Sequence, residues 1–213
     1  MGAGGAPFPT PRKPMRILVV ADVESRFIWE HFDPVLFRGV EMIISCGDLQ
    51  ASYLSYLVTM IPAPLFYVHG NHDGDYARRP PQGCECVDGR VVEYKGVRIA
   101  GLGGCKGTNP AEAHQFSEAQ MEKRVRRLQS ELRRDKRLDL FVTHAPALGV
   151  GDGAAFHQGF QCFHDVYREN LPRFHLFGHI HSLGSPFPTA GQGMYPSGAT
   201  MAINCAGYRL MDI

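Results

Sequence analysis

The chain has 213 residues, 44% of them hydrophobic and 20% charged, which is typical of a globular protein rather than a disordered or fibrous one. The formal net charge of +1 gives no electrostatic reason to expect nucleic acid or a membrane surface as the main partner. Six scattered cysteines in a chain of this length favour reduced thiols in a cytoplasmic protein over a disulfide scaffold. No apolar run approaches the roughly 18 residues that a membrane span requires.

The first 14 residues are rich in Gly, Ala and Pro and lack the apolar segment of a secretory signal. We expect a disordered tail over residues 1–14 and a single domain over residues 15–213. Residues 16–21 form a continuous apolar run with β-branched side chains. Such a run predicts a central strand that is buried on both faces.

Further apolar runs predict strands that alternate with helical segments along the chain. Ser117 is a plausible N-cap for the longest helix, which has apolar side chains on one face. Strands are expected at 42–46, 65–68, 138–142 and 174–177, helices at 27–37, 53–60, 117–134 and 162–170, a hairpin at 90–102, loops at 74–90 and 147–160, and two short strands within 194–213.

Five of the predicted strands end in side chains that can bind a metal ion or move a proton. Because strands that alternate with helices form largely parallel sheets, their carboxyl ends meet at one edge. Mixed nitrogen and oxygen donors suit Mn²⁺, Fe or Zn²⁺ better than Ca²⁺. We therefore expect two divalent cations at this edge. The candidate residues are Asp22, Glu24, Asp48, Asn71, His72, His144, His179 and His181.

Each candidate also has a simpler structural interpretation when it is taken alone. Asp48 is a possible helix N-cap, residues 71–74 are a possible tight turn, and His144 or His179 is a possible hydrogen-bonded core histidine. The repetition at five strand ends favours a shared site. Among the other histidines, we expect His175 in the core, His31, His114 and His164 at the surface, His69 as a support for the site, and His157 as a substrate contact from its loop.

The motifs at these strand ends occur in the order found in a known family. They are Asp22-x-Glu24, Gly47-Asp48, Gly70-Asn71-His72-Asp73, Thr143-His144-Ala145-Pro146 and Gly178-His179-Ile180-His181. The chain thus resembles the calcineurin-like metallophosphoesterases, and residues 146–181 look most like their small metallophosphoesterase-domain phosphodiesterase branch. The resemblance implies an α/β fold with a two-sheet β-sandwich core flanked by helices, in four layers α/β/β/α, and a binuclear centre at the sheet edge.

The resemblance also implies a role for each residue. Asp48 would bridge the metals, and Asp22 and His181 would bind the first, with Glu24 in the place of a family histidine. Asn71, His144 and His179 would bind the second, with Mn favoured over Fe or Zn. A metal-bridging hydroxide would attack a small-molecule phosphodiester, or a monoester. His72 would act as general acid, because an imidazole can transfer protons near neutral pH.

Two positions depart from the family pattern. Glu24 replaces the histidine of D-x-H, which favours a harder ion at the first site or leaves that site weak. Ala51 replaces the second aspartate of G-D-x-x-D, which in the family orients the catalytic histidine, so Asp73 is a possible substitute support for His72. These departures keep open an alternative function as a catalytically weakened scaffold or protein-binding module. A nuclease is a weaker hypothesis, because no basic groove is evident.

Overall fold

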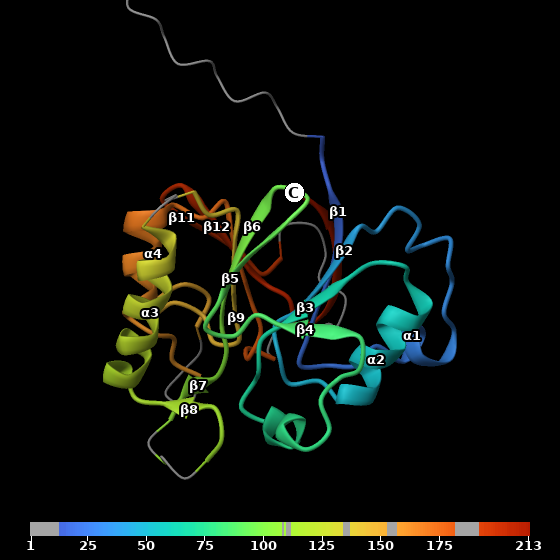
Figure 1. The fold of residues 1–213 in the computed structure, drawn as a ribbon, viewed down its shortest axis with the longest axis horizontal. Helices are drawn as coiled ribbons and strands as arrows, with labels where there is room; N and C mark the ends of the chain where they lie inside the picture. The colour runs from blue at the N-terminus through green and yellow to red at the C-terminus, as the bar shows by residue number, and fades with distance from the viewer. Residues whose placement is uncertain (1–12, 108, 110–111, 134–136, 153–156, 182–191) are drawn as a thin grey trace, which may run out of the picture.

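The structure is a computed structural model that describes residues 13–107, 109, 112–133, 137–152, 157–181 and 192–213. Two large β-sheets lie in the middle of the molecule, with helices α1 and α2 outside one sheet and α3 and α4 outside the other (Figure 1). This is the four-layer α/β arrangement that the sequence predicts. The expected disordered tail lies outside the described residues, except for Lys13 and Pro14.

The first sheet contains the strands that precede Asp22, Asp48 and Asn71. Its strand order is β13-β1-β2-β3-β4, with parallel neighbours from β1 to β4 and β13 antiparallel to β1. Its strands are β1 (Arg16–Ala21), β2 (Met42–Ser45), β3 (Leu65–Tyr67), β4 (Cys84–Cys86) and β13 (Gly207–Asp212). In β1, Val19 packs between the two sheets and Leu18 packs under the helices, so both faces are buried and the strand is apolar throughout.

The second sheet has the order β11-β12-β10-β9-β6-β5, and β12, β10, β9 and β6 are parallel neighbours. Its outer strands β11 and β5 pair antiparallel with β12 and β6. Its strands are β5 (Val91–Tyr94), β6 (Val97–Leu102), β9 (Leu140–Thr143), β10 (Phe174–Phe177), β11 (Met194–Ser197) and β12 (Thr200–Asn204); a small separate pair is β7 (Cys105–Lys106) with β8 (Gln115–Phe116).

The helices cover the outer faces of the sheets with apolar stripes. The described helices are α1 (Arg26–Glu30), α2 (Ala51–Met60), the 3₁₀ helix η1 (Asp73–Ala77), α3 (Glu118–Leu132) and α4 (Phe163–Asn170). As predicted, Ser117 caps α3, and it forms a capping box with Gln120. No helix in the described part of the chain is long and apolar enough to cross a membrane. All six cysteines are free thiols.

Three predicted segments differ from the structure. The helix expected over residues 27–37 ends at Glu30, because Pro34 has no N–H to donate and Asp33 Oδ1 instead accepts from Val35 N at 2.9 Å in a turn. The loop expected at 74–90 contains η1 and β4. The carboxyl-terminal region holds three strands rather than two. The short strands β4 and β11 are only partly buried and pair with other strands, so their own sequence shows little periodicity.

Backbone hydrogen bonds continue one residue past the strand ends and hold the following loops together. Cys46 N donates to Val20 O at 2.9 Å, Val68 N to Ser45 O at 3.1 Å, and Gly178 N to His144 O at 2.9 Å. The segments that follow β1, β2, β3, β9 and β10 therefore meet at one edge of the two-sheet core, as the sequence predicts.

Candidate metal centre

Glycines precede three of the candidate ligands because the loops pass very close to one another. A Cβ atom at Gly47 would overlap the backbone of Gly70, and one at Gly70 would overlap the carboxylate of Asp48. A Cβ atom at Gly178 would collide with the carboxylate of Asp22. The glycines before Asp48, Asn71 and His179 therefore let the strand ends approach closely enough to share one site.

Three of the candidate ligands have left-handed backbone conformations, which are uncommon for residues other than glycine. The φ angles are 61° at Asp22, 58° at Asp48 and 67° at His179. The Asp22 carboxylate accepts hydrogen bonds from His179 N at 2.9 and 3.0 Å, and Asp48 Oδ1 accepts one from His72 N at 2.8 Å. Strained backbone of this kind persists where the surrounding contacts over-determine it, and it is concentrated at functional sites.

His144 is fully buried at the centre of the group. Its Nδ1 donates to the carbonyl oxygen of Cys46 at 2.9 Å, which leaves Nε2 facing Asp48 Oδ2 at 3.2 Å and Asn71 Oδ1 at 3.0 Å. Burial disfavours a charged imidazole, but the hydrogen bond to Asp48 and the charges of Asp22 and Asp48 raise the pKa of His144 to about 9. The surroundings of Nε2 therefore attract positive charge, either a proton or a metal cation.

His179 supplies the observation that favours a metal over a proton. Its Nε2 is buried and has no hydrogen-bond partner in the described part of the chain. Burial, followed by the charge of neighbouring His144, lowers the pKa of His179 to about 3, so its imidazole is neutral and presents a lone pair. Donor atoms of Asp48, His144 and His179 all lie within 4.8 Å of one another. Because buried nitrogens rarely remain unsatisfied, these residues fit a bound cation.

Of the residues expected to bind the first metal, Asp22 and His181 lie near each other, but Glu24 points elsewhere. Asp22 Oδ1 lies 3.8 Å from His181 Nε2 and 4.0 Å from His144 Nδ1. Burial raises the pKa of Asp22 against the opposing effect of His144. The structure turns Glu24 toward the helices, where Oε2 accepts from Trp29 Nε1 at 2.6 Å and Oε1 from Gln50 N at 3.0 Å.

His72 and Asp73 have separate positions although they are adjacent in the sequence. The His72 side chain is 80% exposed, and its Nε2 is 4.0 Å from Asp48 Oδ2, which places it beside the candidate ligands. Asp73 is buried, and its Oδ2 accepts from Gly70 N at 2.7 Å and Asp48 N at 2.9 Å. The expected support of His72 by Asp73 is therefore replaced by a structural role, in which Asp73 holds two ligand loops together.

An open cavity of about 1010 Å³ adjoins these residues, and its lining includes Asp22, Asp48 and His72. On another side of the site, the His157 ring lies 4.9 Å from that of His179 and 6.4 Å from that of His181, measured between centroids. The His157 side chain therefore lies beside the group, and its contact with a substrate stays a prediction.

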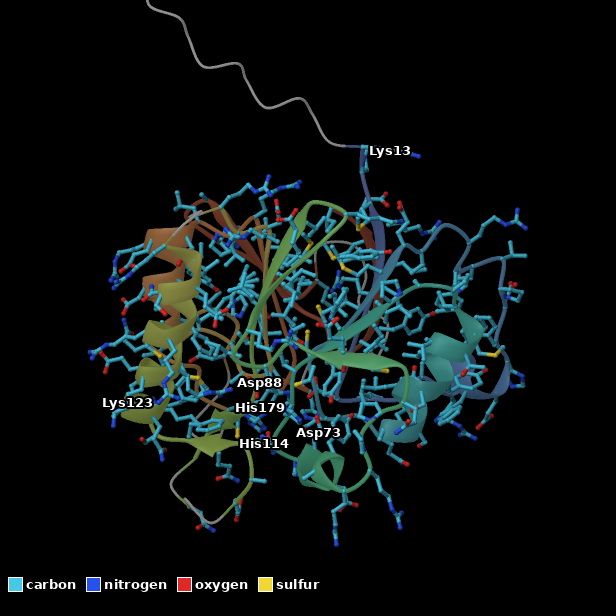
Figure 2. The ribbon with its side chains drawn as sticks, in the orientation of Figure 1. Lys13, Asp73, Asp88, His114, Lys123 and His179 are labelled. Carbon is cyan, nitrogen blue, oxygen red and sulfur yellow. The ribbon has the colours of Figure 1, made fainter. Side chains whose placement is uncertain are left out.

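A second group of metal-capable residues, His69, Asp88 and His114, was missed by the sequence interpretation. The His114 ring, which was expected at the surface, is half-buried and stacks on His69 with centroids 4.4 Å apart and planes at 7°. His114 and Asp88, which Figure 2 labels, lie close together. The Asp88 carboxylate accepts a hydrogen bond from Gly103 N at 2.7 Å and forms an ion pair with Arg124. Asp88 follows β4 as Asp22 follows β1, and this signal was hidden because β4 was not predicted.

The chain was compared with known proteins in sequence and in structure. No curated protein is significantly similar to the chain in sequence. Among solved structures, the protein TT1561 of Thermus thermophilus has a TM-score of 0.62 at 16% identity, covering 94% of this chain and 99% of that one. GAP50, the anchor in the inner membrane complex of Plasmodium, has a TM-score of 0.51 at 12% identity, covering 92% of this chain and 72% of that one. These likenesses show the fold alone.

The family is shown by a sequence model rather than by these structures. The model of the calcineurin-like phosphoesterases matches residues 15–183, which contain every candidate ligand at the sheet edge. The chain therefore belongs to the calcineurin-like phosphoesterase family.

Proposed function

We propose that the chain is a metal-dependent phosphoesterase that hydrolyses a small-molecule phosphodiester or, less favourably, a monoester. The observation that carries the proposal is that donor atoms of Asp48, His144 and His179 lie within 4.8 Å of one another, while the buried Nε2 of His179 has no hydrogen-bond partner among the described residues. Two imidazoles and a carboxylate gathered this closely suit a divalent cation. Membership of a phosphoesterase family supports the choice of substrate.

The residues that would hold metal fall into two sets. Asp48, Asn71, His144 and His179 would hold one cation, and Asp22 and His181, with Glu24 nearby, would hold the other. The mixed oxygen and nitrogen donors suit Mn, Fe or Zn, of which we favour Mn. When bound, such cations supply Lewis acidity toward phosphoryl oxygens and lower the pKa of water.

The chain's own groups supply positioning and proton transfer. His72 is exposed beside Asp48 and would donate a proton to the leaving alkoxide. The backbone of His72 is fixed by its hydrogen bond to Asp48 Oδ1, so its position is tied to that of a ligand. His157, which lies against the ring of His179, would donate to a phosphoryl oxygen of the substrate.

The alternative is a scaffold or protein-binding module in which the centre is weakened. One structure with this fold, GAP50, is described as an anchor, so the fold is compatible with such a role. The turn of Glu24 toward Trp29 and Gln50 also weakens the argument for a full first site. We favour the enzyme because Asp48, Asn71, His144 and His179 are all retained and gathered.

Metal analysis combined with turnover would decide between the two. We expect the purified protein, stripped with a chelator and reloaded with Mn²⁺, to bind up to two cations per chain. It should then hydrolyse bis-p-nitrophenyl phosphate faster than p-nitrophenyl phosphate. Chelator-treated protein without added metal is the control. If Mn²⁺, Fe²⁺ and Zn²⁺ all fail to bind and to support turnover of either ester, the scaffold is correct.

A further inference from the structure

The cavity beside the candidate metal centre extends well beyond the ligands. It begins at Asp22 and Asp48, passes His72, and continues between α2 and η1 to Arg79. A general acid lies on the side from which the leaving group departs. If His72 is that acid, the alcohol part of the substrate occupies this cavity, so the lining of the cavity describes the leaving group. This step rests on the proposed function.

The acidic side chains of the cavity are already engaged by protein groups. Glu24 accepts from Trp29 and Gln50, and Asp73 accepts from two backbone N–H groups. Asp75 pairs with Arg78 at 2.7 Å. With Asp22 and Asp48 assigned to the cations, these contacts account for the negative charges that line the cavity.

The cationic side chain of Arg79 takes part in none of these contacts. It lines the same cavity, is exposed, and forms no ion pair with any residue that the structure describes. Guanidinium groups bind phosphate and carboxylate through paired hydrogen bonds, so an unpaired one in a cavity favours an anionic ligand.

The position of Arg79 along η1 indicates which part of a substrate it would meet. The 3₁₀ helix Asp73–Ala77 separates it from His72, and five residues at about 2 Å each span roughly 10 Å. A group bound by Arg79 is therefore some way from the phosphate held at the metals. It belongs to the far end of the leaving alcohol rather than to the reacting phosphate.

We infer that the substrate is a phosphoester whose leaving alcohol carries a second anionic group, either a phosphate or a carboxylate, which Arg79 binds. Calorimetric titration of the Mn²⁺-loaded protein tests this with non-hydrolysable phosphonate analogues of alkanediol bisphosphates of graded chain length, of the matching phosphorylated hydroxy acids, and of alkyl monophosphates. The best doubly anionic compound should bind about tenfold more tightly than the monophosphate of equal length. Whichever doubly anionic series binds better identifies the second group.

Variants assign this preference to Arg79. Arg79→Ala should remove most of the tenfold preference, and Arg79→Lys should keep part of it. Arg127→Ala, which removes an exposed arginine of α3 on the other side of the molecule, is the matched control and should keep all of it. The inference is overturned if no ligand binds, if the wild type shows no preference, or if Arg79→Ala keeps the preference. Failure of the proposed function is separate, since it appears as absent turnover of the p-nitrophenyl esters.

Discussion

The described part of the chain contains two clusters of the same composition, and they differ in the arrangement of their imidazole rings and in the partners of their carboxylates. Each cluster has two histidines and one aspartate with donor atoms within 4.8 Å of one another: Asp48, His144 and His179 in the first, and His69, Asp88 and His114 in the second. In the first, the two rings are inclined at 60° with centroids 4.9 Å apart. In the second, the rings are nearly parallel, with an angle of 7° between their planes.

The difference between the clusters follows from the direction of the imidazole lone pairs. A lone pair lies in the plane of its ring, and two parallel, stacked planes share no point where a cation could be bound by both. The carboxylate of Asp88 also forms an ion pair with Arg124, whereas the ion-pair partners of Asp48 among the described residues are His144 and His72. On this geometry we expect a metal ion at the first cluster and not at the second.

The second cluster instead supports the loop that carries Asn71. Asp88 contacts His69 Nδ1 at 3.4 Å and Gly103 N at 2.7 Å, and Gly104 N donates to His69 O at 2.7 Å. Arg124 adds a bond to Gly103 O at 2.7 Å. These contacts join the segments after β3, β4 and β6 to helix α3, so we assign the cluster a structural role.

Exchanging each aspartate for asparagine gives the sharpest test of this comparison. Asp48→Asn removes a charged ligand, and we expect loss of bound Mn²⁺ and a fall in turnover on the order of a thousandfold, or about 4 kcal/mol. Asp88→Asn, the matched change in the second cluster, should keep the metal content of the wild type. Elemental analysis and turnover of bis-p-nitrophenyl phosphate measure both effects. Loss of metal in Asp88→Asn would show that the second cluster also binds a cation.

The next prediction concerns the histidine that lies beside the first cluster without belonging to it. His72→Ala should keep its metal but lose roughly 10²–10⁴-fold in turnover of esters with poor leaving groups, because the departing alkoxide is no longer protonated. The loss should be much smaller for p-nitrophenyl esters, whose leaving group needs little protonation. His31→Ala, at an exposed histidine after α1, is the control. Full activity of His72→Ala on an ester with a poor leaving group would disprove the assignment.

The smallest expected effect is on stability and tests the structural role of the second cluster. Burial would lower the pKa of His69, but hydrogen bonds to Asp88 and Cys86 raise it to about 9, compared with about 6.5 for an unfolded histidine. Because the folded state holds the proton more tightly, this stabilisation is fully present below pH 6.5 and is lost as the pH rises through about 9. It amounts to at most about 3 kcal/mol.

Denaturant unfolding of the wild type and of His69→Gln, both in the presence of a chelator, would measure this effect. The stability difference between the two proteins should be larger at about pH 6 than at about pH 9.5. Comparing the two proteins at each pH removes the contribution of the other titrating groups, including His144. A difference that does not change with pH would mean that the ion pair of His69 and Asp88 contributes no stability.

The strands that carry the candidate ligands were predictable because they are buried on both faces. The apolar runs before Asp22, Asp48, Asn71, His144 and His179 each form a strand, and their ends meet at one edge. Partly buried strands were not predictable in the same way. β4 pairs with β3 through backbone hydrogen bonds. This pairing places Asp88 close to His69, in the second cluster.

Sequence patterns did not predict the directions in which individual side chains point. Asp73 binds the backbone of Gly70 and Asp48 instead of supporting His72, and Glu24 binds Trp29 and Gln50. His114 was predicted at the surface, but its ring stacks on that of His69. Each of these outcomes depends on a partner that another segment or a neighbouring turn supplies, so it is settled only when the loops are packed together.

The sequence by itself therefore determined that the segments after β1, β2, β3, β9 and β10 meet at one edge, because hydrophobic periodicity places strands and parallel strands share an edge. Only the tertiary structure decided how the rings and carboxylates of each cluster are turned and which protein groups they contact. It left Nε2 of His179 without a protein partner among the described residues, and it gave the carboxylate of Asp88 to Arg124. Ring orientation and counter-charge depend on contacts between distant segments, and for that reason two clusters of identical composition have different surroundings.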